Sequence, residues 1–117
     1  MRNFKNLKLW EEAMNMAEMV YVITEVYSKD ERFNLISQSR RAATSVPSNI
    51  AEGCGYDSDA QLNRFLQIAQ GSAFELETQL LLAKKLKIIV SEQGFLALMD
   101  KINHVQKMIY NFQQAIK

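Results

Sequence analysis

Apolar residues recur at three- and four-residue steps along most of the chain, which is the spacing of one face of an α-helix. The first such stretch runs from about Leu7 to Ser28. The polar segment 28–32 follows it and indicates a short turn between antiparallel helices. The predicted core face of the first helix contains Leu9, Ala13, Met16, Ala17, Val20, Ile23, Thr24 and Tyr27.

A second helix is expected from about Asn34, with a face built mostly from small side chains. Pro47 lies inside it, and an interior proline removes a backbone hydrogen bond and clashes with the preceding turn, which costs about 3 kcal/mol. The alternatives are one helix kinked near residues 41–46 or two shorter helices that break before Pro47. Because the apolar spacing stays in phase through Ile50, we favour one kinked helix, ended by Gly53 and Gly55.

Serine residues mark the starts of two further helices. Ser58 is followed at the third position by Gln61, and Ser91 is followed at once by Glu92, so both serines are predicted N-caps. Four helices joined by short links predict an all-α fold, an antiparallel up-and-down four-helix bundle. The third helix ends in cations, which oppose the negative pole of its dipole: Lys84, Lys85 and Lys87.

Length and composition favour a single folded domain over residues 1–117. A chain of 117 residues can bury one hydrophobic core but is too short for two. Hydrophobic residues make up 48% and charged residues 23%, which is typical of globular proteins rather than disordered ones. One proline and four glycines are too few for many tight hairpins, so long helices are favoured.

Cysteine usage and hydropathy favour a cytoplasmic protein. A single cysteine allows no intrachain disulfide. Residues 1–10 lack the continuous apolar core of a signal peptide, and no stretch approaches the roughly 20 apolar residues of a membrane span. The net charge of +1 argues neither for nor against a nucleic-acid partner.

Candidate chemistry is sparse, and we expect no catalysis, no metal and no cofactor. His104 and Cys54 are the soft ligand residues of the chain, and neither has a partner at ligand spacing. A di-iron bundle needs Glu-x-x-His pairs, whereas Lys101 stands three residues before His104. Cys54 lies between two glycines, and we interpret it as part of a flexible helix end rather than as a nucleophile.

The most unusual segment is 40–53, where adjacent arginines and small polar residues share a helix with proline. Adjacent side chains point about 100° apart on a helix. One arginine is therefore expected to pair with an acidic residue such as Glu52 or Glu75, while the other reaches solvent or a ligand. Gln38 and Asn49 lie near the small-residue face, where amides fix helix register by hydrogen bonding.

Three segments carry a family resemblance: QSRRAA (38–43), SVPSNIAEG (45–53) and RFLQIAQGS (64–72). Together with Phe4-x-x-Leu7-x-x-Trp10 and with residues 75–77, they resemble the bacterial four-helix-bundle proteins encoded in intervening sequences of 23S ribosomal RNA genes, often labelled ribosomal proteins. The motif positions to which the resemblance assigns a structural role are Gln38, Pro47, Asn49, Glu52, Gly53, Gly71 and Ser72.

The resemblance implies a homo-oligomer, a pentamer. Similarity to accessory proteins of diversity-generating retroelements further implies binding to structured RNA or to a nucleic-acid-processing protein such as a reverse transcriptase. The first hypothesis is therefore an RNA-associated module, and the alternative is a scaffold whose exposed apolar residues Phe4, Leu7 and Trp10 bind a protein. The basic residues expected to contact RNA are Arg40, Arg41, Arg64, Lys84, Lys85 and Lys87.

Overall fold

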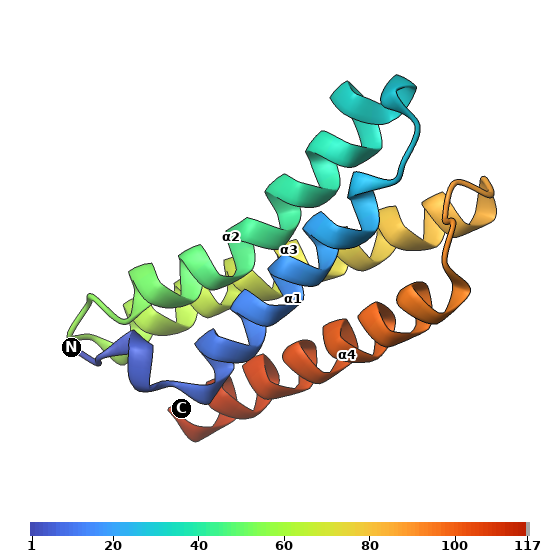
Figure 1. Ribbon diagram of the computed structural model, residues 1–117. Coiled ribbons are helices and arrows are strands. Elements are labelled where there is room, and N and C mark those ends of the chain that lie inside the picture. Colours follow the sequence, from blue (N-terminus) through green and yellow to red (C-terminus); the bar gives the residue numbers. More distant parts are fainter. Residues whose placement is uncertain (117) are drawn as a thin grey trace.

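The computed structural model describes residues 1–116, apart from the side chain of Arg32. Within that range the protein is all-helical and forms an antiparallel bundle in which α1 packs between α2 and α4 (Figure 1). The bundle measures 44 × 24 × 20 Å. Its four long helices are α1 (Lys8–Glu25), α2 (Ser37–Gly53), α3 (Asp59–Lys85) and α4 (Glu92–Ala115).

Short helical turns complete the chain path. A 3₁₀ turn, Phe4–Asn6, precedes α1. The predicted polar turn is a second 3₁₀ segment, Lys29–Glu31, and it leads into a π-helical turn, Arg32–Ile36, that continues directly into α2. The chain therefore reverses direction between α1 and α2 without an extended loop.

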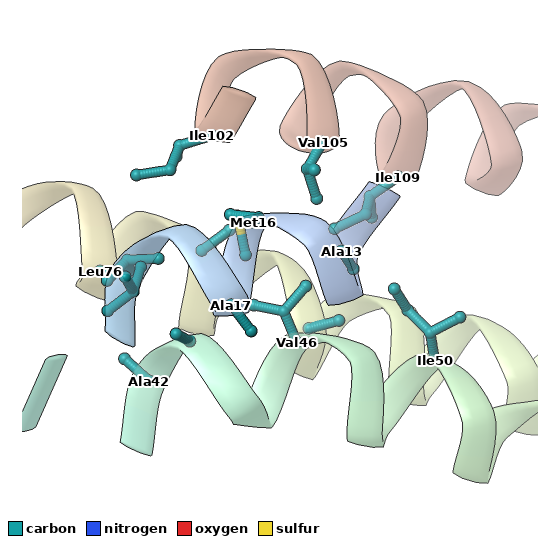
Figure 2. Packing of buried hydrophobic residues seen from close by; sticks show 14 of the residues in the cluster. Ala13, Met16, Ala17, Ala42, Val46, Ile50, Leu76, Ile102, Val105 and Ile109 are labelled. Atoms are coloured by element: carbon teal, nitrogen blue, oxygen red, sulfur yellow. The ribbon is translucent and has the colours of Figure 1, made fainter. Parts of the chain in front are cut away.

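The core lies along the bundle axis, and each long helix contributes one stripe to it. Figure 2 shows Met16, Val46, Leu76 and Ile102 converging from the four helices. Thr24 shares this stripe although it is polar, because its hydroxyl donates to the Val20 carbonyl oxygen at 2.7 Å. A smaller apolar cluster closes the end of the bundle at the α1–α2 connection: Tyr27, Leu35 and Ala83.

Both predicted serine caps are confirmed. The Ser58 hydroxyl accepts from the Gln61 amide at 3.1 Å, and the Ser91 hydroxyl accepts from the Gly94 amide at 2.9 Å. The end of α3 is less regular, because Lys87 has a φ of 62°, in the left-handed region that favours glycine. There the Ile88 amide donates back to the Ala83 carbonyl at 2.9 Å, which closes the helix with a Schellman motif.

Pro47 does not divide α2. The helix is continuous from residue 37 to residue 53, so the single-helix alternative is the observed one (Figure 1). Polar side chains support the backbone around the proline: the Thr44 hydroxyl donates to the Arg40 carbonyl at 3.1 Å, and the Asn49 amide donates to the Ser45 carbonyl at 2.8 Å. The buried proline ring is thus held inside a helix supported on either side.

Gly53 does not end α2 in the way that the sequence suggested. Neither Gly53 nor Gly55 has a positive φ, so neither provides a left-handed helix end. A Cβ on Gly53 would instead lie 2.9 Å from Phe65 Cβ and 3.1 Å from Leu62 Cδ1. Gly53 is therefore required by the close approach of α2 to α3.

We predict that Gly53→Ala destabilises the fold by about 1–3 kcal/mol, because the added methyl group forces α2 and α3 apart. Gly71→Ala is the matched control. A Cβ there would meet no atom within 4 Å, so alanine should stabilise α3 by about 0.5–1 kcal/mol. Urea unfolding of both variants at one dilute protein concentration measures the difference. Equal effects of the two substitutions would contradict this role of Gly53.

An ion pair fastens α1 to α4. Lys101 Nζ lies 2.7 Å from Glu12 Oε1, and Lys8 Nζ lies 3.8 Å from Glu12 Oε2. Glu12 is only 8% exposed. The hydrogen bond from Lys101 lowers the pKa of the Glu12 carboxyl group, an effect that outweighs the opposing effect of burial.

We predict that Glu12→Gln lowers the free energy of unfolding at pH 7 and that this deficit shrinks as the pH falls below 4.5 and through the lowered folded pKa of Glu12. A carboxyl group whose pKa is lowered by folding stabilises the native state above its unfolded pKa, near 4.5, and that contribution is lost as the pH falls through the folded value. Urea unfolding of both proteins between pH 7 and pH 3 tests this. A deficit that stays constant with pH would refute it.

Candidate functional site

The predicted basic residues do not form one patch on a protomer. Arg40 and Arg41 lie near the start of α2, and Lys84, Lys85 and Lys87 lie at the end of α3. These five residues therefore share one end of the antiparallel pair (Figure 1). Arg64 lies 21 residues before Lys85 on α3. At about 1.5 Å per residue, this separates the two by roughly 31 Å along the helix.

Arg40 is a structural residue of the α1–α2 contact. Its Nε donates to Thr24 Oγ1 at 2.9 Å, and its Nη2 donates to the Tyr21 carbonyl at 3.3 Å and to Glu25 Oε2 at 3.0 Å. The guanidinium carbon also lies 4.5 Å from the centroid of the Tyr21 ring. With its donors and its flat face engaged in this way, Arg40 links the two helices.

The predicted acidic partner of the arginine pair was wrong. Neither Glu52 nor Glu75 pairs with an arginine within residues 1–116; the observed carboxylate is that of Glu25, on α1. The second arginine, Arg41, is exposed as expected, and its Nη2 lies 3.4 Å from Gln38 Oε1.

Lys84 is also engaged within the fold. It forms an ion pair with Glu92 across the α3–α4 connection, and its Nζ lies 5.1 Å from the centroid of the Phe95 ring. Lys85 and Lys87 are exposed, and no ion pair holds either of them in the part of the chain that the structure describes. Among the predicted basic residues at this end, Arg41, Lys85 and Lys87 therefore make no ion pair with another described residue.

Polar motif residues join α2 to α3 at mid-length. The Ser45 and Ser72 hydroxyl groups lie 2.9 Å apart, and the Asn49 side-chain amide donates to the Ser45 hydroxyl at 2.9 Å. Asn49 is half-buried, and both of its hydrogen bonds are to Ser45 of its own helix, so it reaches α3 only through the Ser45 hydroxyl. Gln38 is half-buried too, but its hydrogen bond is to Arg41 of its own helix, so it does not link α2 to α3.

Phe4, Leu7 and Trp10 are not the exposed apolar residues that the sequence suggested. All three are half-buried and pack against the core, with the Phe4 and Trp10 rings edge to face at 5.1 Å. Phe4 and Trp10 form one end of a shallow groove between α1 and α2, with a volume of about 480 Å³. The groove is lined by Phe4, Trp10, Met14, Ala17, Glu18, Tyr21, Thr44, Pro47, Ser48 and Ala51.

The potentially reactive side chains are far from any catalytic arrangement. Cys54 is 1% exposed, and burial raises the pKa of its thiol group. Cys54 is the C-cap residue of α2, as expected, but it belongs to the packed core rather than to a flexible helix end. Burial, together with the Glu31 carboxylate, raises the pKa of Tyr27 to about 12. His104 is exposed on α4.

Residues 1–116 form neither a metal-binding cluster nor a membrane-spanning helix. No three His, Cys, Asp or Glu side chains within residues 1–116 cluster so as to hold a metal ion. Among the helices formed by these residues, none combines the length and the apolar character needed to cross a bilayer.

Comparisons with known proteins agree with this architecture. The chain resembles a structure described as a protein of unknown function from the S23 ribosomal protein family of Bacteroides thetaiotaomicron VPI-5482. The identity is 20%, the TM-score is 0.80, and the alignment covers 90% of this chain and 97% of the other. No curated protein matches the chain. The family model for the 23S rRNA-intervening sequence protein matches residues 5–111. The chain therefore belongs to the 23S rRNA-intervening sequence protein family.

Proposed function

We propose that this protein is a non-enzymatic, self-associating module of the cytoplasm that binds structured RNA. The observation that supports the proposal most directly is the set of exposed cations at one end of the bundle: Arg41, Lys85 and Lys87. The name of the family connects it with ribosomal RNA genes, and the S23 relative belongs to a family named for ribosomal proteins.

Self-association would allow such a small group of cations to bind RNA with useful affinity. A protomer of net charge +1 attracts a polyanion weakly, and three cations release few counterions. In a closed oligomer, such as the pentamer that the family resemblance implies, symmetry repeats the cluster around one end. The combined surface then meets several phosphates at once, and the tethered contacts reinforce one another.

The absence of a catalytic role is part of the proposal. Cys54 is buried and has a raised pKa, so it is a poor nucleophile at neutral pH. His104 lies on an exposed helix face beside Asp100 and Lys107, where solvent weakens any acid–base partnership. RNA would therefore be bound through its phosphates and its shape rather than chemically changed.

We predict that Arg41→Gln combined with Lys85→Gln weakens binding of a labelled RNA stem-loop and flattens its salt dependence. Each phosphate contact contributes roughly 0.7–0.9 to the slope of log K against log salt concentration. The doubly substituted protein should therefore lose roughly 1.4–1.8 units of slope per bound protomer. Fluorescence anisotropy between about 50 and 200 mM salt measures affinity and slope together.

The matched control is Lys5→Gln combined with Lys107→Gln. Both lysines are exposed and lie outside the cluster, and their replacement changes the net charge equally. The control should retain the wild-type slope. Wild-type protein that shows no salt-sensitive RNA binding at 50 mM salt would refute the proposal, as would equal losses in the two doubly substituted proteins.

The second candidate function is a protein-binding scaffold that does not bind nucleic acid. The α1–α2 groove favours it, because most of the groove surface is apolar and several of its residues remain exposed. Affinity capture before and after nuclease treatment separates the two functions. Partners that RNA connects to the protein disappear after the treatment, whereas direct protein partners remain.

A further inference from the structure

We infer that the RNA bound by this protein offers an unpaired base, which stacks on the ring of Phe33 at one end of the bundle. This inference rests on the proposed RNA-binding function and specifies the kind of RNA that the protein recognises. Phe33 is 87% exposed, the highest value of any aromatic side chain among the described residues. An aromatic ring in that position contributes little to the core, so its exposure calls for another role.

A π-helical turn presents this ring to solvent. Phe33 lies in the turn Arg32–Ile36, which joins the α1–α2 connection to the start of α2. Two other residues of the turn pack inward: Leu35 is a member of the smaller apolar cluster, and Ile36 packs against that cluster. Single π-helical turns are frequent at functional sites. The turn is therefore anchored by two aliphatic side chains, while its one aromatic side chain stays outside.

Phe33 and Lys85 both lie next to the smaller apolar cluster in the chain. Phe33 is two residues from Leu35, and Lys85 is two residues from Ala83, so each is within about 7 Å of chain from a member of the cluster. The α1–α2 and α3–α4 connections accordingly lie at the same end of the bundle (Figure 1). An RNA strand whose base stacks on Phe33 thus has its phosphates at the end that carries the proposed cations.

Cations outnumber carboxylates at this end of the bundle. Two ion pairs there are already closed, Arg40 with Glu25 and Lys84 with Glu92. The remaining cations are all exposed, and none makes an ion pair with another described residue: Lys29, Arg41, Lys85 and Lys87.

Two carboxylates oppose these four cations, and one of the two faces inward. Asp30 is exposed. One carboxylate oxygen of Glu31 is buried, and burial, followed by the charge of Glu31, raises the pKa of Tyr27 in the smaller apolar cluster. The end that carries Phe33 therefore has an excess of positive charge, which attracts a polyanion rather than an apolar protein surface.

An exposed ring combined with unpaired cations is the arrangement that binds single-stranded nucleic acid. The phenyl ring has no hydrogen-bonding group, so it recognises the flat face of a base and not its edge. In a duplex the neighbouring base pairs cover these faces, whereas loops, bulges and strand ends leave them open. Phe33 therefore selects RNA with an unpaired base, without preference for one base sequence.

Three labelled RNAs separate stacking from phosphate binding. The first is a hairpin with a loop of unpaired adenosines. The second is the same hairpin with abasic nucleotides in the loop, which keep the phosphates and lack the bases. The third is the same stem closed as a blunt duplex. Fluorescence anisotropy over a salt series gives the affinity and the salt slope for each RNA.

We predict that Phe33→Ala weakens binding of the adenosine-loop hairpin by roughly 5- to 150-fold, the loss expected when a stacked base loses its aromatic partner. The salt slope should stay at the wild-type value, because the ring neutralises no phosphate. Phe33→Tyr should bind like the wild-type protein and Phe33→Leu like Phe33→Ala, since only tyrosine keeps an aromatic face. The abasic hairpin should bind equally weakly to the wild-type protein and to Phe33→Ala.

The matched control is Leu86→Ala, because Leu86 is an aliphatic residue that is 57% exposed at the same end of the bundle. It should bind the adenosine-loop hairpin like the wild-type protein. Circular dichroism checks that the helix content of each variant is unchanged. If Phe33→Ala loses helix content, the comparison of Phe33→Tyr with Phe33→Leu decides, because both keep a large apolar side chain.

The contrary outcomes separate this inference from the proposed function. Wild-type protein that binds the hairpin, the abasic hairpin and the duplex equally tightly refutes the stacked base and leaves RNA binding intact. Equal losses in Phe33→Ala and Leu86→Ala indicate a general apolar contact and also refute the stacked base. Wild-type protein that binds none of the three RNAs refutes both the inference and the proposed function.

Discussion

The close approach of α2 and α3 is the constraint on which the rest of the structure depends. At Gly53 there is no room for a methyl group, since its Cβ would lie 2.9 Å from that of Phe65. The hydrogen-bonded Ser45–Ser72 pair extends this contact along α2. Because α2 buries few large side chains, its stability relies on many short-range dispersion contacts that only close approach provides. The same packing holds Pro47 within a continuous helix.

Once α2 is fixed, polar contacts set the position of α1. Arg40, on α2, contacts α1 through hydrogen bonds to Thr24, Tyr21 and Glu25. On another side of α1, the Glu12–Lys101 ion pair connects it to α4. Each contact joins a partly buried cation to a neighbouring helix, so breaking either one leaves a polar group poorly solvated. These contacts therefore fix the orientation of α1 relative to α2 and α4, and with it the shape of the α1–α2 groove.

The sequence predicted those features of the fold that are determined within one helix. Apolar spacing identified the four helices. The local pattern around Ser58 and Ser91 identified the N-caps of α3 and α4. It could not predict which helix a side chain meets, since periodicity places a residue on a face but not beside a neighbour. For that reason the carboxylate partner of Arg40 and the packing role of Gly53 were missed. The exposed spacing of Met14 and Tyr21 was a usable signal for the groove.

Sequence periodicity likewise does not show which cations are engaged within the fold and which remain accessible to a ligand. Counting cations in the sequence overstates the proposed RNA surface, because Arg40 and Lys84 are engaged in holding helices together. Arg64 is exposed near the start of α3, away from these residues. If copies associate with parallel axes, Arg41 and Lys85 from every copy lie at the same end of the assembly. RNA would then contact that end of the oligomer, where symmetry repeats cations that the fold itself leaves free.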